Sequence, residues 1–503
     1  MPVLLVAGCA PWDRPLPVRT EVTEAGVTAR LAVPPDLNVN PAETVVKPGT
    51  PGQESADSGA SHNLERERTT FALADAIAFA LRNSPRLRSA RAAIERARGQ
   101  EQVAFAPFLP QIDLFGQYGV VSGTLNPGVP GYTGSLRADG EGTRDYAQTE
   151  LGLQWTLYDF GRTGGRYRQS VARGRIAERQ LVRADQTVEF DVATAYVDVL
   201  LTRAYRRVQI DAVRRAEAIL DETVARRTGG VALREDVLRA QVQVSESREA
   251  LVLAREREFD AVAHLNNAMG RNASWPLEVI DLEVQPPLPG ALDDLLECAA
   301  VQRPEVSLVR EEVAAAQEGW QAARAEFLPR IFVRAVAGHA EGQSVITGWQ
   351  EGAGLHVEAP LYAGGRHIGE LRSAEADIDA AVANAQAVLD AISLQVNLAY
   401  RGVVAANERI DLSRTAVVQA QENLRLLRVR YRNGDATPTD IVDSETALTR
   451  SQQRFFSATY AYLAALARVD YAVGQRQGGG FTPNGKATER DELPLPHPSP
   501  EMK

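Results

Sequence analysis

The sequence has little cysteine, few aromatic residues and no long apolar run, and each shortage excludes a class of protein. Only two of its 503 residues are cysteines, Cys9 and Cys298, which argues against a disulfide-stapled scaffold. No window of 18 consecutive apolar residues occurs, so we do not expect a membrane-spanning helix, which leaves a soluble protein or a β-barrel. Aromatic residues make up 6% of the chain while alanine and arginine dominate, a composition typical of long helices.

Positive charge and chemistry-bearing motifs are also scarce. The chain has 65 acidic and 55 basic residues, a net charge of −10, and no stretch concentrates basic residues without interleaved acids, so a nucleic-acid partner is not expected. The six histidines show no metal-ligand spacing, and there is neither a nucleophile elbow nor a phosphate-binding loop. We therefore predict no metal site, no cofactor and no enzymatic activity.

The first nine residues end in a motif that indicates lipidation. Val6-Ala7-Gly8-Cys9 resembles the lipobox at which bacterial lipoproteins are cleaved and acylated, which predicts a lipid anchor on Cys9. Residues 1–9 are then the remnant of a lipoprotein signal, because the positive region and most of the apolar region of a secretory signal are missing. The alternative is an accidental match. Ala10 follows the cysteine, which by the same resemblance implies sorting to the outer membrane.

Between two polar end segments the sequence contains an internal duplication. Residues 10–68 and 475–503 are rich in Pro, Gly and charge and are predicted to be a linker and a disordered tail. The Phe-Leu-Pro-Gln-Ile segment at 108 recurs as Phe-Leu-Pro-Arg-Ile at 327, an offset of 219. A Leu-Tyr pair followed by Gly-Arg, at 157–162, recurs at 361–366 with an offset of 204 that continues to the end of the copy. We predict repeats at 70–270 and 291–474, joined by a linker at 271–290.

Each copy begins with helical periodicity and then changes to strands. A short amphipathic helix, 73–83 or 292–302, is followed by proline, which ends helices. Alternating apolar and polar residues then predict strands at 108–122 and 146–159, and at 328–340 and 350–362. Such alternation fits a membrane barrel with a lipid-facing and a wet face, or an ordinary surface hairpin with one buried face. Four strands are too few to close a barrel, so a barrel would require neighbouring chains to cover the open edges.

A long helical hairpin completes each copy, at 163–269 and 366–473. Apolar residues recur at steps of four and three, which is a coiled-coil seam, and glycines interrupt both helical stretches, so each copy predicts an antiparallel coiled-coil hairpin. The seam residues are Val188, Val192, Ala195 and Val199 in the first copy and Ile392, Val396, Ala399 and Val403 in the second.

In their order, repeated twice, these features resemble the TolC family of outer-membrane efflux proteins. The resemblance covers about residues 70 to 475 and rests on the duplication, the two Phe-Leu-Pro openings, the two Gly-Arg ends and two hairpin tips of the form Gly-x5-Asp. It implies a mostly α fold with a membrane β-barrel: four strands per chain in a barrel shared by a homotrimer, continued by an α-helical barrel of coiled-coil hairpins. The expected location is the outer membrane, extending into the periplasm.

The resemblance also implies a function and partners. The protein would be the exit duct of a tripartite efflux or type I secretion system, passing small molecules or proteins outward without chemistry. Its partners would be a periplasmic adaptor (membrane fusion) protein, an inner-membrane pump of RND or ABC type, and outer-membrane lipid. The alternative is a periplasmic coiled-coil scaffold whose strands form soluble hairpins.

Acidic residues near the hairpin tips are the candidate gate. Asp440 and Asp443 share a helix face, and in the family acids at matching positions line the periplasmic entrance. Asp236 matches Asp440 in the first copy, where Arg239 replaces the second acid. Helix capping by the Thr-Pro-Thr-Asp segment at 437–440 is an alternative reading of Asp440.

The glycine-containing tips are the candidate adaptor contacts. These tip residues are Gly229, Gly230, Val231, Asn433 and Gly434. Their sequences depart from the Val-Gly-Leu type that is frequent in the family, which leaves the type of adaptor open.

Overall fold

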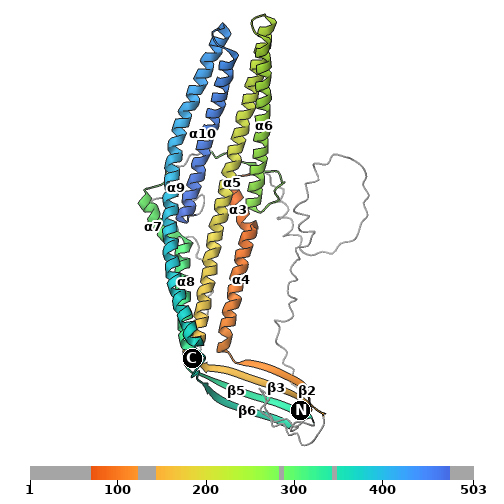
Figure 1. Ribbon diagram of the computed structural model, residues 1–503, viewed down its shortest axis with the longest axis vertical. Helices are drawn as coiled ribbons and strands as arrows, with labels where there is room; N and C mark the ends of the chain where they lie inside the picture. The colour runs from red at the N-terminus through yellow and green to blue at the C-terminus, as the bar shows by residue number, and fades with distance from the viewer. Residues whose placement is uncertain (1–69, 123–142, 283–287, 343–347, 476–503) are drawn as a thin grey trace, which may run out of the picture. The chain divides into compact units, whose positions relative to one another are not determined.

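A computed structural model describes residues 70–122, 143–282, 288–342 and 348–475 of the chain (Figure 1). Our predictions for the signal remnant 1–9 with Cys9, the linker 10–68 and the tail after residue 475 lie outside these ranges. Within the described ranges, no helix is both long enough and apolar enough to cross a membrane.

The elements follow the same order in both copies. The first copy consists of β1 (Thr70–Phe71), α3 (Leu73–Asn83), α4 (Pro85–Phe105), the 3-10 turn η2 (Ala106–Phe108), β2 (Gln111–Ser122), β3 (Thr143–Tyr158), α5 (Arg162–Thr228) and α6 (Arg234–Met269). After β4 (Glu278–Val279), the second copy consists of α7 (Leu292–Gln302), α8 (Pro304–Ala325), β5 (Arg330–Gly342), β6 (Gly348–Glu358), α9 (Arg366–Asn433) and α10 (Pro438–Val473). The predicted helices 73–83 and 292–302 are confirmed.

The compact units of the structure cut across the two sequence copies. Unit 1 takes its described residues from the segments 1–84, 188–288 and 402–468, and unit 2 takes them from 85–187, 289–401 and 469–503. The two compact units therefore do not coincide with the two sequence repeats. The reason is packing: both units combine elements of the two copies, and the long helices α5 and α9 each contribute to both.

Unit 2 contains a four-stranded antiparallel sheet in the order β2-β3-β5-β6, with β2 and β6 at its edges (Figure 1). The register aligns rows of like character. One row across the sheet is Ile112, Leu153, Ala335 and Ala353, and the neighbouring row on the opposite face is Gln111, Gln154, Arg334 and Gly354. The predicted alternation thus gives a sheet with one apolar and one mixed polar face, and large apolar side chains such as Leu114, 74% exposed, remain uncovered.

The last strand is shorter than predicted. Alternation suggested a strand at 350–362, but β6 ends at Glu358, and Leu361 and Tyr362 lie outside it, almost fully exposed. Pro360 explains the difference, because proline has no N–H to donate to a sheet ladder. The other three strands begin or end within three residues of the predicted limits.

A tyrosine on α5 organises the core of unit 1. The Tyr196 hydroxyl donates to the carbonyls of Ile280, at 2.6 Å, and Phe71, at 3.1 Å, and accepts from the Ile280 N–H at 2.9 Å. It thereby holds the two short parallel strands β1 and β4 together. The segment 271–290, predicted to be a plain linker, contains β4, which is too short for sequence periodicity to reveal.

The coiled-coil seams are buried nearly as predicted. Seven of the eight predicted positions are buried, whereas Ala195 is only half-buried. Its neighbour Tyr196 occupies the seam position instead and is fully buried. A step from Val192 to Tyr196 and on to Val199 keeps the helical period of 3.6, so the first-copy seam is shifted by one residue at this turn.

Candidate functional site

Both hairpin tips end their first helix with the same glycine turn. Gly230 and Gly434 have left-handed backbones, with φ of 76° and 88°. In each tip the N–H just after the glycine bonds back to a carbonyl of the last helical turn, from Val231 to Arg226 and from Asp435 to Arg430, both at 2.9 Å. This is the Schellman arrangement, in which glycine avoids a Cβ clash. The predicted tip residues lie at these turns and are exposed.

The capping role predicted for Asp440 is present. Its carboxylate accepts from the Thr437 N–H at 2.8 Å and from the Thr437 hydroxyl at 2.7 Å, and the Thr437 hydroxyl accepts from the Asp440 N–H at 3.3 Å. These bonds lower the pKa of Asp440, the backbone bond most. Within the described part of the chain Asp236 accepts from the Leu233 N–H alone, at 2.9 Å, because leucine has no side-chain oxygen to complete the box.

Asp443, unlike Asp440, does not cap the helix. It is exposed one turn further along α10, and no described residue forms a hydrogen bond or ion pair with its carboxylate. Arg239, which stands at the matching position in the first hairpin, bonds to the Thr439 hydroxyl at the start of α10. The structure therefore gives Asp440 a cap and leaves Asp443 available for another role.

Sequence reasoning missed a buried acid just beyond these two. Glu445 is 8% exposed and pairs with Arg215 of α5 and Arg428 of α9, each at 2.5 Å. Arg215 also donates to the Thr449 hydroxyl at 3.0 Å. The cluster joins helices of both hairpins inside unit 1, and no local pattern signals it, because its members come from distant segments.

A second contact joins the hairpins at the tip itself. Arg226 donates to the Tyr431 carbonyl at 2.6 Å, and its guanidinium lies 4.3 Å from the centre of the Tyr431 ring. The Thr223 hydroxyl is 3.5 Å from the Tyr431 hydroxyl. The end of α9 is thus fastened to the last two turns of α5.

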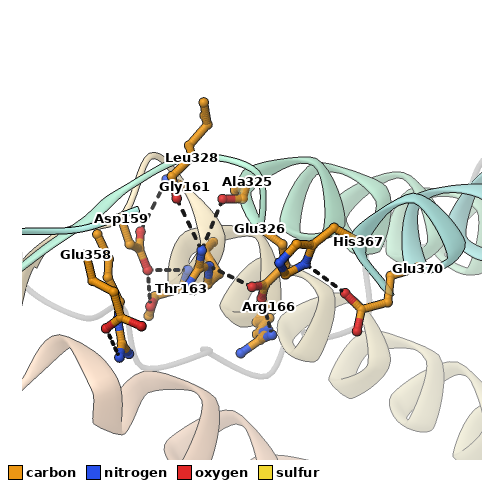
Figure 2. A network of polar contacts seen from close by, with 12 residues as sticks. Asp159, Gly161, Thr163, Arg166, Ala325, Glu326, Leu328, Glu358, His367 and Glu370 are labelled. Carbon is orange, nitrogen blue, oxygen red and sulfur yellow. Dashed lines mark hydrogen bonds and ion pairs between the residues drawn. The ribbon is translucent and has the colours of Figure 1, made fainter. Parts of the chain in front are cut away.

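At the junction of strands and helices in unit 2, a carboxylate fixes the turn from β3 into α5 (Figure 2). Asp159 accepts from the N–H groups of Gly161, at 3.2 Å, and Thr163, at 2.8 Å, and from the Thr163 hydroxyl. These N–H groups start the helix and have no partner within it. The Asp-x-Gly-Arg segment therefore ends β3 and caps the start of α5.

The next residue of this motif connects the two copies. Arg162 donates to the carbonyls of Ala325, at 3.3 Å, and Leu328, at 3.4 Å, and forms an ion pair with Glu326 at 3.3 Å. Arg166 reaches the same carboxylate at 2.7 Å. The Gly-Arg segment after β3 in the first copy thus contacts the residues that lead into β5 in the second. Figure 2 labels Arg166, Glu326 and Leu328 at this contact.

The same junction lines an open cavity of about 830 Å³. Its lining includes five arginines, but four of them already pair with acids: Arg162 and Arg166 with Glu326, Arg330 with Glu358, and Arg366 with Glu370. Arg173 is the remaining arginine of this lining. Among the described residues no group of three or more His, Cys, Asp or Glu is placed to hold a metal ion.

The chain matches the sequence model of the outer membrane efflux protein family over residues 76–271 and 295–475, which include most of both copies. It is 25% identical to the alkaline protease secretion protein AprF of Pseudomonas aeruginosa over 437 residues, 82% of this chain and 86% of AprF. It is 23% identical to the cation efflux system protein CusC of Escherichia coli O157:H7, over 76% of this chain and 82% of CusC.

Solved structures share the fold. The outer membrane protein VceC of Vibrio cholerae superimposes with a TM-score of 0.68 at 21% identity, over 80% of this chain and 96% of VceC. The open state of the MtrE outer membrane channel of Neisseria gonorrhoeae gives a TM-score of 0.65 at 18% identity, over 80% of this chain and 89% of MtrE. The chain is a member of the outer membrane efflux protein family, the TolC-like outer membrane factors.

Proposed function

We propose that the protein is the outer-membrane exit duct of a tripartite efflux or secretion system and works as a homotrimer. The observation that carries the proposal is the four-stranded sheet of unit 2. Its edge strands β2 and β6 have no partner within the described chain, and apolar side chains on one face are exposed. Open edges and an apolar face are tolerated in lipid only if other chains complete a closed barrel.

The helices support a shared tunnel beyond the barrel. Large apolar side chains remain exposed along α6 and α9, among them Val242, Phe259, Leu398 and Leu412. Side chains of this kind on long helices indicate packing against further helices. In the proposed trimer the hairpins of three chains form an α-helical barrel that covers these residues and leads from the periplasm to the outer membrane.

The partners follow from the family. A periplasmic adaptor would contact the exposed tips at Gly229, Gly230, Val231, Asn433 and Gly434, and an inner-membrane pump of RND or ABC type would supply the cargo. AprF is named for protease secretion and CusC for cation efflux, so relatives of similar identity support both protein and small-molecule cargo. Cys9 remains the predicted lipid anchor.

The acids near the tips have separate roles in this proposal. Asp443, exposed and without a structural partner, would face the periplasmic entrance and favour cations there. Asp440 and Asp236 would contribute charge at the same entrance while capping their helices.

Detergent extraction of outer membranes, followed by light scattering of the purified protein, tests the proposal. A trimer that needs detergent and conducts ions in a planar bilayer is the expected result. A monomer or dimer in the aqueous fraction would contradict it and favour the periplasmic scaffold.

A further inference from the structure

Arg366 occupies the same place in the second copy as Arg162 does in the first, yet its role is open. Arg162 holds the strand opening of the other copy, through Ala325 and Leu328. Arg366 starts α9, is 63% exposed, and has a loose ion pair with Glu370 at 3.5 Å. In the described chain β6 is an edge strand. No described strand follows it in the sheet, so Arg366 has no strand-leading segment beside it of the kind that Arg162 contacts.

Among the described residues, the segment that leads into β2 has the same turn as the segment that Arg162 contacts. The Leu109 N–H bonds to the Ala106 carbonyl at 3.0 Å, just as the Leu328 N–H bonds to the Ala325 carbonyl at 3.1 Å. The two turns have the same hydrogen-bond pattern, and the Leu109 side chain is 53% exposed. This opening leads into β2, the other edge strand of the sheet.

The acidic partner of the arginine lies in a different place in the two repeats. Arg162 pairs with an acid from the other repeat, whereas Arg366 pairs with an acid on its own helix. In the internal junction, Glu326 supplies the carboxylate from the opposite side, and Arg166 shares it. The first-copy residue equivalent to Glu326 is Pro107. The second-copy residue equivalent to Arg166 is Glu370. Arg162 and Arg366 thus each have one carboxylate partner, Glu326 and Glu370 respectively.

We propose that Arg366 donates to the carbonyls of Ala106 and Leu109 of a neighbouring chain, at the place where β6 meets β2 of that chain in the proposed trimer. The proposal rests on the proposed assembly of several copies and specifies its contact. A second chain is the partner because the segment before β2 has the same turn as the segment before β5, and because both edges of the sheet lack a partner in the described chain.

The duplication also determines the register of this contact. Within the chain Leu151 pairs with Ala337 and Gly152 pairs with Val336. Adding the offset of 204 to the first member and subtracting 219 from the second places Leu355 (151 + 204) opposite Tyr118 (337 − 219). The same arithmetic places His356 (152 + 204) opposite Gln117 (336 − 219). Leu355 and Tyr118 are 65% and 70% exposed, as a contact between copies requires.

Cysteine cross-linking of the intact protein in native outer membranes tests the register. In a background with Cys298 replaced by serine, and with Cys9 retained because the predicted acylation blocks its thiol, one variant carries Leu355→Cys with Tyr118→Cys and a second carries His356→Cys with Gln117→Cys. The two pairs lie on opposite faces, so one of them has the closer non-hydrogen-bonded spacing. The matched control, Leu355→Cys with Val120→Cys, keeps the face but shifts the register by two residues, to a diagonal separation of about 7–8 Å.

The expected result is rapid oxidation of at least one in-register pair to covalent dimers and trimers, with little product from the control. Equal or greater cross-linking of the control would overturn the proposed register. If the unmodified protein is a monomer in detergent, the assembly itself fails, whereas a trimer that cross-links only out of register refutes this inference and leaves the duct intact.

Substitutions at the junction test the arginine without introducing cysteine. Arg366→Ala is expected to lower the temperature at which the oligomer dissociates in detergent, while Arg372→Ala, an exposed arginine on the same helix, leaves it unchanged. Glu370→Gln should weaken the oligomer, and adding Pro107→Glu should restore it, because the acid then lies where Glu326 does in the internal junction. An unchanged dissociation temperature for Arg366→Ala would refute the arginine contact.

Discussion

Phe160 and Gly364 occupy equivalent positions in the two copies and have nearly the same left-handed backbone, with φ of 55° and 62°. Glycine adopts this conformation without a Cβ clash, whereas a bulky side chain does so rarely and at a cost. Phe160 is the one described residue other than glycine with a positive φ. The turn between Asp159 and Arg162 is therefore kept even where its sequence opposes it.

Removing the Phe160 side chain should separate this strain from the packing of the ring. The ring lies 4.7 Å from the Tyr158 ring, a contact worth about 1 kcal/mol. Phe160→Ala loses that contact and keeps the strained backbone, whereas Phe160→Gly loses the contact but relieves about 1 kcal/mol of strain. We expect the glycine variant to melt at a higher temperature in detergent than the alanine variant. Gly364→Ala, the matched control, should be destabilised.

The two acids at the start of α10 should respond differently to substitution. Asp440→Ala removes the cap and should speed amide hydrogen exchange in the first turn of α10, whereas Asp443→Ala should not. The lowered pKa of Asp440 means that its stabilising effect is complete above the ordinary aspartate value of 3.8 and is lost only as pH falls through the lower folded value. The cap should therefore be insensitive to pH between 5 and 8.

Asp443→Asn should instead reduce cation selectivity in planar bilayers while leaving hydrogen exchange unchanged. A loss of the first helical turn in this variant, or an unchanged reversal potential, would contradict an entrance role for Asp443.

The sequence predicted best those features that depend on local chemistry. Glycine and proline mark the ends of helices and strands, so the tips at Gly230 and Gly434 and the capping by Asp440 could be derived from short segments. Alternation predicted the sheet but overran at Pro360, where backbone chemistry outweighs side-chain pattern.

Long-range packing could not be predicted in the same way. No sequence pattern near Glu445 indicates that it pairs with Arg215. The strand β4 is too short to show an alternating pattern. That the compact units cut across the copies follows from which helix faces meet, and a duplication alone does not specify this. The contact of Arg162 with Ala325 and Leu328 likewise appears only when the strands are in place.

The buried Glu445 cluster should be a major contributor to the stability of unit 1. Removing one partner of a buried ion pair leaves an uncompensated charge and typically costs about 3–5 kcal/mol, so Glu445→Ala should strongly lower the apparent melting temperature. Arg215, 19% exposed, should depend on this carboxylate more than Arg428, 41% exposed. Combining Glu445→Leu with Arg215→Met should recover most of the loss, because the buried charges are then both absent. A small effect of Glu445→Ala would show that water reaches the cluster.

Asp470, near the end of α10, should make stability fall as pH rises through the mildly acidic range. Burial raises the pKa of its carboxyl from 3.8 to about 6, so the folded chain keeps a proton that the unfolded chain has lost. The resulting penalty is absent below pH 3.8, grows between about pH 4 and 6, and is then constant at no more than about 3 kcal/mol.

Asp470→Asn removes the charge and should raise the apparent melting temperature at pH 7.5, while matching the wild-type protein near pH 4. The Asp443→Asn variant makes the same substitution at an exposed position of α10 and is the matched control. Equal gains for Asp470→Asn at both pH values would mean that the substitution acts through packing, because only the charged carboxylate responds to pH in this range.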